Sequence, residues 1–477
     1  MALPLLILAL IMIALLKLII KGKKNNDYIL PPDHPKLPII GNLHRLRALP
    51  HRSLSELSKQ HGPVMLLQLG RIPTLIISSA DAAKEALKTL DHEFYSRPAL
   101  HAWPQASTKT ISEFNRVQAS GKTRADEVAN MIEFITSSAS SSSSSSYVNL
   151  TKELLSLTYR TICRVTFGES YDIDIRFQES VIEAMALLGA FSGSDFFPDY
   201  CVVLGPYARL EKCFRGFDAL FQKVIDERAV ASTRRSSEVE DITDVLLRMK
   251  KDQISIGGGA FTFTDDNIKA IFMDLFVGGM GAPAVTVIWA MTELMRKPVT
   301  MKKLQREIRN KVGNKGEVEE ADLGQLQYLK VVIKETMRLH PPEALLVPRE
   351  SINQCKINGY DIMPKTRVLV NAWAIGRSPE SWKDPKKFSP ERFEHSSVDY
   401  KGHHYEYVPF GAGRRICPWI GLGVAMLELA LANLLYCFHW ELPSEMKEEA
   451  VSMDEAAGII VHKKYDLRLV PVKYVPE

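Results

Sequence analysis

Residues 410–418 read Phe-Gly-Ala-Gly-Arg-Arg-Ile-Cys-Pro and place Cys417 in a glycine-bearing loop behind two arginines. The largely apolar run 420–436 that follows predicts a buried helix. A cysteine at the beginning of a helix meets the positive end of the helix dipole and unpaired backbone N–H groups, and both favour the thiolate. The thiolate is the form that ligates metals, haem iron among them. The alternative is that Cys417 is a small buried hydrophobic residue, as most lone cysteines are.

Two further segments carry charged residues at informative spacing. Residues 334–342 read Lys-Glu-Thr-Met-Arg-Leu-His-Pro-Pro, so Glu335 and Arg338 lie on one face of a helix that the proline pair ends. Residues 388–393 read Phe-Ser-Pro-Glu-Arg-Phe and add Arg392. Taken singly, each segment is also compatible with an ordinary surface ion pair, which is common and weak.

Together and in this order, the three segments resemble the cytochrome P-450 superfamily of haem-thiolate proteins. Glu335 and Arg338 match its Glu-x-x-Arg, residues 390–393 its Pro-Glu-Arg-Phe, and residues 410–417 its haem-binding loop. The resemblance covers nearly the whole chain and is closest to the plant microsomal enzymes of specialised metabolism. It implies a mainly α fold with small β-sheets behind an N-terminal transmembrane helix.

The resemblance also implies a cofactor, haem b, and a role for each matching residue. Cys417 would be the axial ligand of the iron, in a haem-binding loop that includes Phe410 and Gly411. Arg415 and Arg349 would bind the two haem propionates, which suits arginine because it binds carboxylates in a bidentate manner. The alternative for each arginine is that it merely solvates a surface. The structural residues of the scaffold would be Glu335, Arg338 and Arg392.

The central helix, which in the family crosses over the haem, departs from the family's pattern. Gly281 stands where the family has an acid, and Ala282 where it has a threonine. Those two groups relay protons for oxygen activation, and general acid assistance is typically worth about 10²–10⁴-fold. Pro283 removes a backbone donor and predicts a kink. Thr286 lies one turn beyond Ala282 on the same face, where it could hold a water without directly replacing the lost hydroxyl.

Two other departures concern the surroundings of the haem. Residues 101–115 lead directly into 116–120, which already resemble the sequence beyond the family's next haem-contacting helix. That helix, with its Trp-x-x-x-Arg pattern, is therefore expected to be missing, either as a true variant or through an error in the gene model. Trp103 is no substitute, because Pro104 follows it and no arginine lies four residues on. Trp419 stands two residues after Cys417, where the family usually has a glycine that lets the backbone approach the haem.

The N-terminus predicts a membrane anchor. Residues 3–20 are apolar apart from Lys17, and a span needs roughly 20 such residues. Lys21, Lys23 and Lys24 follow, so the positive-inside rule keeps the rest of the chain cytosolic. A cleaved signal peptide is the alternative, but the charges follow the apolar run and no cleavage site is evident. We expect an anchor at 1–20, a basic stop and proline-rich hinge at 21–44, and a haem-thiolate catalytic domain at 45–477, in the endoplasmic reticulum membrane.

Charge and cysteine usage narrow the class further. The net charge of +4, with both signs interleaved, gives no nucleic-acid signature. The six cysteines fit no zinc-ribbon or Cys-x-x-Cys pattern. On the cytosolic side thiols stay reduced, which preserves Cys417 as a ligand, and we expect the other five to be packing residues.

Between the motifs the pattern is mostly helical. Expected helices cover 304–312, 326–339 and 423–438, and a long helix capped near Thr264 runs to about residue 296. Residues 64–70 and 74–80 predict a hairpin, with Ser79 or Asp81 capping the helix that follows. Residues 366–375 predict a further strand, and the serine-rich run 137–146 predicts a loop.

Three functions follow from these observations. The first is a membrane-anchored monooxygenase that oxidises a small lipophilic plant metabolite, with NADPH-derived electrons from a flavoprotein reductase and cytochrome b5 as a further donor. The second keeps the haem but catalyses a rearrangement or isomerisation without oxygen activation, because Gly281 and Ala282 have no side-chain proton to give. The third is a degenerate, non-catalytic haem protein. Terpenoid, alkaloid and phenolic substrates all remain open, because a fold does not choose between them.

Overall fold

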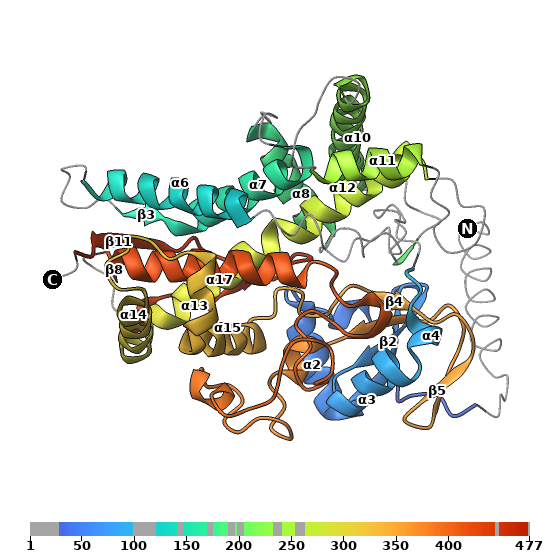
Figure 1. Cartoon of the computed structure of the whole chain (residues 1–477). Helices are drawn as coiled ribbons and strands as arrows, with labels where there is room; N and C mark the ends of the chain where they lie inside the picture. Colours follow the sequence, from blue (N-terminus) through green and yellow to red (C-terminus); the bar gives the residue numbers. More distant parts are fainter. Residues whose placement is uncertain are drawn as a thin grey trace, which may run out of the picture.

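The computed structural model describes residues 28–98, 121–140, 147–168, 175–188, 196–197, 205–231, 241–252, 263–443 and 448–475. Helices dominate the described residues, and short strands form small sheets at their margin (Figure 1). The predicted fold class, mainly α with small β-sheets, is therefore confirmed. The expected membrane anchor at 1–20 lies outside the described residues.

The helical elements include short 3₁₀ turns and the following α-helices: α2 (Pro50–His61), α3 (Ala80–Lys84), α4 (Asp91–Phe94), α6 (Gly121–Ser140), α7 (Leu150–Phe167), α8 (Ile175–Leu188), α10 (Gly205–Ala231), α11 (Ile242–Lys251), α12 (Asp265–Gly279), α13 (Gly281–Met295), α14 (Pro298–Val312), α15 (Gln327–Leu339), α16 (Ala372–Ile375) and α17 (Ile420–Cys437). The strands are β1 (Val64–Leu69), β2 (Ile72–Ile77), β3 (Val148–Asn149), β4 (Arg349–Glu350), β5 (Cys355–Ile357), β6 (Tyr360–Ile362), β7 (Arg367–Val370), β8 (Phe438–Glu441), β9 (Glu455–Ala456), β10 (His462–Lys463) and β11 (Arg468–Lys473). The largest sheet has the strand order β1-β2-β7-β4.

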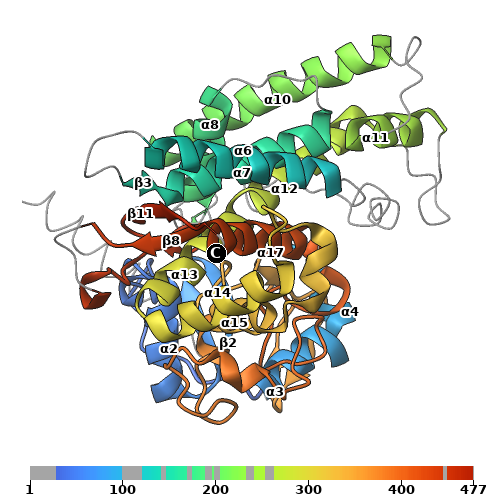
Figure 2. The ribbon, with the colours of Figure 1, turned by 60° about the vertical axis from the view of Figure 1, so that its left-hand side comes forward.

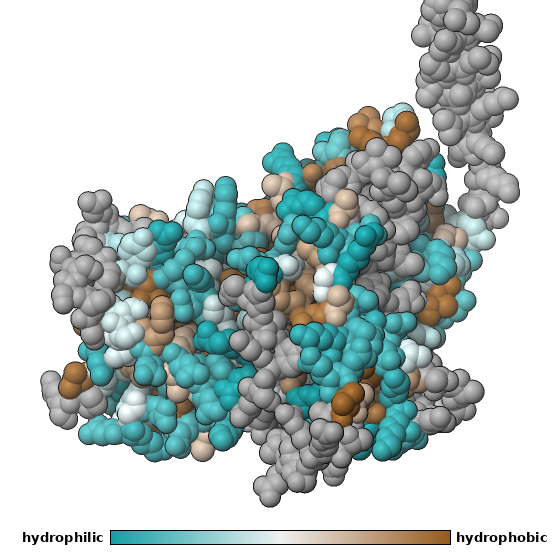
Figure 3. Space-filling model, turned by 90° about the horizontal axis from the view of Figure 1, so that it is seen from above, coloured by the Kyte–Doolittle hydropathy of each residue, from teal (hydrophilic) through white to brown (hydrophobic). Residues whose placement is uncertain are grey.

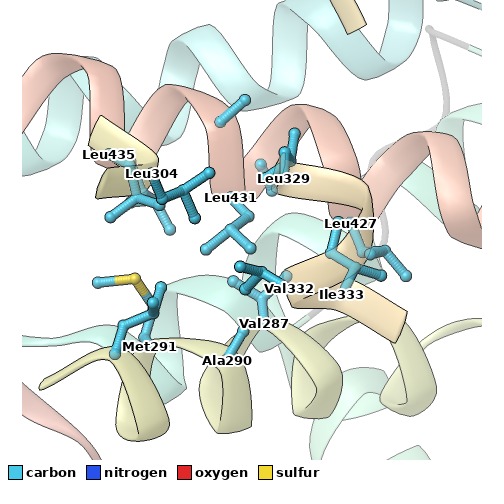
Figure 4. Close-up of a cluster of buried hydrophobic side chains, with 14 of the residues drawn as sticks. Val287, Ala290, Met291, Leu304, Leu329, Val332, Ile333, Leu427, Leu431 and Leu435 are labelled. Carbon is cyan, nitrogen blue, oxygen red and sulfur yellow. The ribbon is translucent and has the colours of Figure 1, made fainter. Parts of the chain in front are cut away.

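The core is built around helix α17. This helix carries apolar residues on nearly every side and is therefore suited to the interior. It lies between α6 on one face and α14 and α15 on the other, as Figures 1 and 2 show from two directions. Leucine, valine and isoleucine side chains from α13, α14, α15 and α17 meet there (Figure 4).

Two stretches of the described chain are long and apolar enough to cross a membrane, Asp265–Met295 and Ile420–Cys437. Most of each stretch is buried inside the protein, which is what a core helix requires. The exterior is different in character. The face in Figure 3 is mostly hydrophilic, with hydrophobic side chains in separate spots.

The predicted hairpin and both predicted helix caps are confirmed. Strands β1 and β2 pair antiparallel, with Val64 opposite Ile77. The Ser79 hydroxyl accepts a hydrogen bond from the backbone N–H of Ala82 at the start of α3. Thr264 and Asn267 form a reciprocal capping box at the start of α12.

Two predicted elements are wrong in extent. The strand expected at 366–375 ends at Val370, because the Asn371 side chain accepts a hydrogen bond from the Ala374 N–H and begins α16 instead. The loop expected at 137–146 begins later, because α6 continues to Ser140. The hydroxyls of Ser137 and Ser138 donate to the Phe134 carbonyl, so these serines extend the helix by bonding to its own backbone.

The long central helix is interrupted where Pro283 predicts a kink. Helix α12 ends at Gly279 and α13 begins at Gly281, while Met280 between them keeps helical backbone angles, with φ −77° and ψ −50°. Proline at position 283 has no N–H to donate to the carbonyl four residues earlier, which is that of Gly279. The interruption therefore falls where the missing donor predicts it.

Helix α15 is fixed to the segment before the cysteine loop by the buried carboxylate of Glu335. Arg338 donates to both of its oxygens at 2.7 and 2.8 Å, and Arg392 donates to Oε1 at 3.0 Å. The backbone N–H of Ser389 adds a fourth bond at 2.7 Å. The remaining guanidinium N–H groups of both arginines donate to backbone carbonyls between residues 376 and 387. Glu335 and Arg338 are fully buried, so the surface ion pair considered above does not apply.

We expect Glu335→Gln to lower the free energy of unfolding by about 3–5 kcal/mol, because it leaves two buried guanidinium groups without their counter-charge. The shift of the urea unfolding midpoint measures this loss. The matched control is Glu394→Gln, which removes a partly exposed pair with Lys303 at 2.8 Å and is expected to cost at most about 1 kcal/mol. Equal shifts for the two variants would show that Glu335 contributes no more to stability than the surface pair does.

Candidate functional site

A cavity of about 510 Å³ lies in the interior, within the usual size range of ligand pockets. Its walls come from α12 and α13, from residues 342–349 after α15, and from the loop that precedes α17. Cys417, Ala282 and Thr286 all line it, although they are far apart in the sequence. Most of the lining is apolar, so the cavity suits a largely hydrophobic occupant.

The loop that carries Cys417 is closed by backbone contacts. The Cys417 N–H donates to the Phe410 carbonyl at 2.9 Å, and the turn Gly413–Arg415 lies between them. Gly411 and Gly413 have φ values of +68° and +70°, which L-residues rarely adopt. A side chain at Gly413 would also collide with the Leu87 carbonyl and with Asp91. Glycine at these positions therefore lets the loop present Cys417 to the cavity.

Burial, more than the nearby helix, determines the protonation of Cys417. Burial raises the pKa of the Cys417 thiol to about 12, the backbone N–H of Trp419 lowers it, and the negative charge of Glu343 raises it further. The backbone N–H groups at the beginning of α17 thus favour the thiolate as expected, but in the protein alone burial outweighs them. A bound metal cation supplies what is lacking, because a coordinating thiol gives up its proton.

The described chain offers Cys417 no set of further protein ligands for a shared metal ion. Nowhere in the described chain do three or more His, Cys, Asp or Glu side chains gather to hold a metal ion. The described cysteines are all free, so none is lost to a disulfide there. A single thiol in a large apolar cavity fits a metal whose other ligands belong to a cofactor, as in haem.

Arg349 and Arg415, the two arginines predicted to bind propionates, both line this cavity. Arg349 donates to the Asp91 carboxylate at 3.0 Å and to the Ala412 carbonyl at 2.7 Å. Arg415 donates through Nε to the Tyr95 carbonyl at 2.8 Å. The pKa of each is lowered by burial, and the charge of Arg415 lowers that of Arg349 further.

A third arginine of the site, Arg97, was missed by the sequence analysis. Its Nη1 donates to the carbonyls of Val347 and Pro348 at 2.7 and 2.9 Å. Burial lowers the pKa of Arg97 to about 9, and the nearby charges of Arg349 and Arg415 lower it further. The one available signal was the run Phe-Tyr-Ser-Arg-Pro at 94–98, which fixes an arginine between an aromatic pair and a proline.

The three guanidinium groups make a concentrated positive charge beside an apolar cavity. Mutual repulsion and burial disfavour that arrangement unless anions approach. A planar, apolar ligand with two carboxylates would relieve it, because arginine binds carboxylates through charge-assisted hydrogen bonds. The residues present therefore fit haem, with Cys417 on the same cavity to meet its metal.

The opposite wall holds the atypical residues of the central helix. Ala282 and Thr286 line the cavity, and the Thr286 hydroxyl donates to the Ala282 carbonyl at 2.8 Å. Gly281 is buried, and a side chain added there would overlap the ends of Met185 and Ile460. Apolar side chains thus occupy the place where the family's acid would lie, and no acid stands in for it at this point of the helix.

Trp419 is accommodated at the beginning of α17. It precedes Ile420, the first residue of the helix, and its carbonyl accepts a hydrogen bond from Gly423 at 2.9 Å. The indole packs against the hydrophobic cluster that α7, α8, α10, α11 and α12 share. It also lines the cavity, so the residue where the family usually has glycine forms part of the wall.

Comparison with known proteins agrees with this geometry. The family described as Cytochrome P450 matches residues 31–107 and 104–468, two stretches that meet inside the segment where a helix is expected to be missing. Cytochrome P450 71B10 of Arabidopsis thaliana is 44% identical over 493 residues, covering 97% of both chains. Cytochrome P450 71A1 of Persea americana is 44% identical over 467 residues, covering 91% of this chain and 92% of its own.

Solved structures show the same fold at lower identity. A zebrafish cytochrome P450 with progesterone superposes with a TM-score of 0.74 at 24% identity, covering 89% of this chain and all of its own. Another structure of the zebrafish protein, with abiraterone, gives 0.73 at 23% identity over 90% of this chain. With the cysteine loop, the arginine cluster and the Glu335 network in place, these matches show that the chain belongs to the cytochrome P450 family.

Proposed function

We propose that this chain is a membrane-anchored haem-thiolate monooxygenase that oxidises a small lipophilic plant metabolite. The observation that carries the proposal is one cavity lined by the Cys417 thiol and by three arginines, Arg97, Arg349 and Arg415. The largely apolar wall supports a lipophilic substrate. The plant relatives at 44% identity support a plant metabolite.

In this proposal each residue has a distinct task. Haem, when bound, supplies the oxygen-activating chemistry. Cys417 would ligate its iron, Phe410 and Gly411 shape the loop that presents the sulfur, and the three arginines would hold the propionates. The structural residues Glu335, Arg338 and Arg392 keep the cysteine loop in register with the opposite wall. Thr286 keeps its own proton on the Ala282 carbonyl and so supplies none to the cavity.

The proposal includes a membrane and a source of electrons. Electrons come from NADPH through a flavoprotein reductase, with cytochrome b5 as a further donor. Residues 1–20 anchor the chain in the endoplasmic reticulum membrane as a single pass, with the catalytic domain in the cytosol. In support, exposed apolar side chains gather where the described chain begins, and such patches mark membrane contacts; they are Ile29, Leu30, Leu37 and Ile39.

A second function is favoured by the wall opposite Cys417. Met185 and Ile460 fill the space beside Gly281, and Ala282 presents only a methyl group to the cavity. A haem-thiolate enzyme that catalyses a rearrangement or isomerisation without oxygen activation needs no proton relay at these positions. Tightly coupled NADPH-dependent hydroxylation would exclude this second function.

Cys417→Ser should abolish the thiolate-ligated spectrum, because serine oxygen does not replace a thiolate on haem iron. The measurement is the carbon monoxide difference spectrum of the reduced protein in membranes. Cys437→Ser is the matched control, since Cys437 is also partly buried but does not line the cavity, and it should leave the spectrum intact. An unchanged spectrum in the Cys417 variant would contradict the proposal that Cys417 ligates the haem iron.

Arg97→Gln should speed haem loss about 10–100-fold, because hydrogen bonds to charged groups contribute roughly 1.5–3 kcal/mol each. The rate of haem transfer from the purified protein to excess apomyoglobin reports this change. Arg47→Gln, at an exposed site outside the cavity, should leave the rate unaltered. If the two variants lose haem equally fast, Arg97 does not hold a propionate.

Ala282→Thr should lower the hydrogen peroxide formed per NADPH consumed several-fold, because it returns a hydroxyl donor to the cavity wall. Both quantities are measured in membranes that contain the reductase. Thr286→Val is the comparison, and we expect little change because that hydroxyl already donates to the Ala282 carbonyl. A ratio unaffected by Ala282→Thr would show that the missing hydroxyl does not limit oxygen use.

A further inference from the structure

Glu343, in the segment that follows α15, is an acidic residue that lines the cavity. No hydrogen bond or ion pair joins this carboxylate to the described residues, although it lies in the field of Arg97, as does the other acid of the lining, Asp274. Burial raises the pKa of Glu343, and the positive charge of Arg97 opposes that shift. The side chain therefore faces the interior cavity and is shielded from bulk water.

The backbone around Glu343 is held firmly. The Glu343 carbonyl accepts from the Leu346 N–H at 3.0 Å and closes a turn. On either side, the Pro342 carbonyl accepts from Val461 at 2.7 Å and the Ala344 carbonyl from Trp373 at 3.2 Å. Pro341 and Pro342 restrict the approach from α15. The backbone that carries Glu343 is thus fixed before any ligand arrives.

Folding alone does not explain an acid at this position. A buried carboxyl without partners destabilises the protein, whereas an apolar side chain would extend the surrounding wall. Arg97 is the positively charged side chain that lowers the pKa of Glu343. Its Nη1 donates to the Val347 and Pro348 carbonyls, and Arg97 and Glu343 form no ion pair. Burial favours the neutral acid, and a cation that enters the cavity beside Glu343 would favour the carboxylate.

We propose that Glu343 is a specificity residue that selects substrates carrying a cationic nitrogen, such as a protonated amine. This rests on the proposed function, because the cavity is taken to be the substrate's. A cation beside a carboxylate in an apolar cavity gains a strong, weakly screened attraction, and this attraction favours the ionised form of Glu343. An acidic substrate would meet repulsion there. Of the terpenoid, phenolic and alkaloid classes left open by the sequence, a nitrogenous base fits best.

The test compares two ligands of the same shape and different charge. Benzyltrimethylammonium carries a permanent cation, and neopentylbenzene is its neutral isostere. Binding to the haem-loaded protein is measured by equilibrium dialysis and by the change in the haem absorption spectrum. The variants are Glu343→Gln, which keeps the shape and removes the charge, and Glu428→Gln, a partly buried acid of α17 that does not line the cavity.

We expect Glu343→Gln to weaken binding of the cation about tenfold or more, since removing one partner of a buried charge pair typically has at least this effect. Binding of the neutral isostere should stay the same, and Glu428→Gln should change neither. Unchanged cation binding, or an equal loss for both ligands, would overturn the proposal. The haem content of each protein is read from its absorbance. Absence of haem in the unaltered protein would refute the proposed function, whereas the binding results above test only the role of Glu343.

Discussion

The carboxylate of Glu335 connects the two halves of the site. It sits on α15, and its hydrogen bonds reach Arg392 and Ser389 in the segment that leads toward the cysteine loop. A second link lies nearby, where the Tyr407 hydroxyl donates to the Lys334 carbonyl at 2.9 Å. Directly after α15 the chain forms the cavity wall that holds Glu343 and Arg349. The buried charge of Glu335 therefore helps to set the position of the Cys417 sulfur relative to the cavity wall. Changes in this network would affect both the cysteine loop and the wall that follows α15.

The cavity is electrostatically incomplete without an occupant. Its arginines have lowered pKa values, and Cys417 is a thiol with a pKa of about 12 in the protein alone. A ligand with two carboxylates and a central cation would satisfy both conditions at once, because the carboxylates approach the guanidinium groups while the metal displaces the thiol proton. The features that look unfavourable in the protein alone thus become mutually consistent when they are considered with haem.

Much of this arrangement could be predicted from the sequence, and the rest shows where sequence reasoning ends. The fold class, the hairpin, the caps and the interruption near Pro283 follow from local chemistry, so periodicity and turn residues were sufficient. Arg97 was missed because its role depends on Val347 and Pro348, which are distant in the chain. The size of the opposing effect at Cys417 was not predictable, because burial, a property of the whole fold, outweighs the local effect of a helix terminus there. Glu343 drew no notice in the sequence because nothing there reveals that its carboxylate lacks a partner.

The packing at Gly281 makes this position depend on two distant side chains. The ends of Met185, from α8, and Ile460, near the C-terminus, lie where a Cβ atom at position 281 would stand. A larger residue at this position would therefore require both flexible side chains to shift. Because the three residues are in contact, the effects of substituting them should not add as independent changes would.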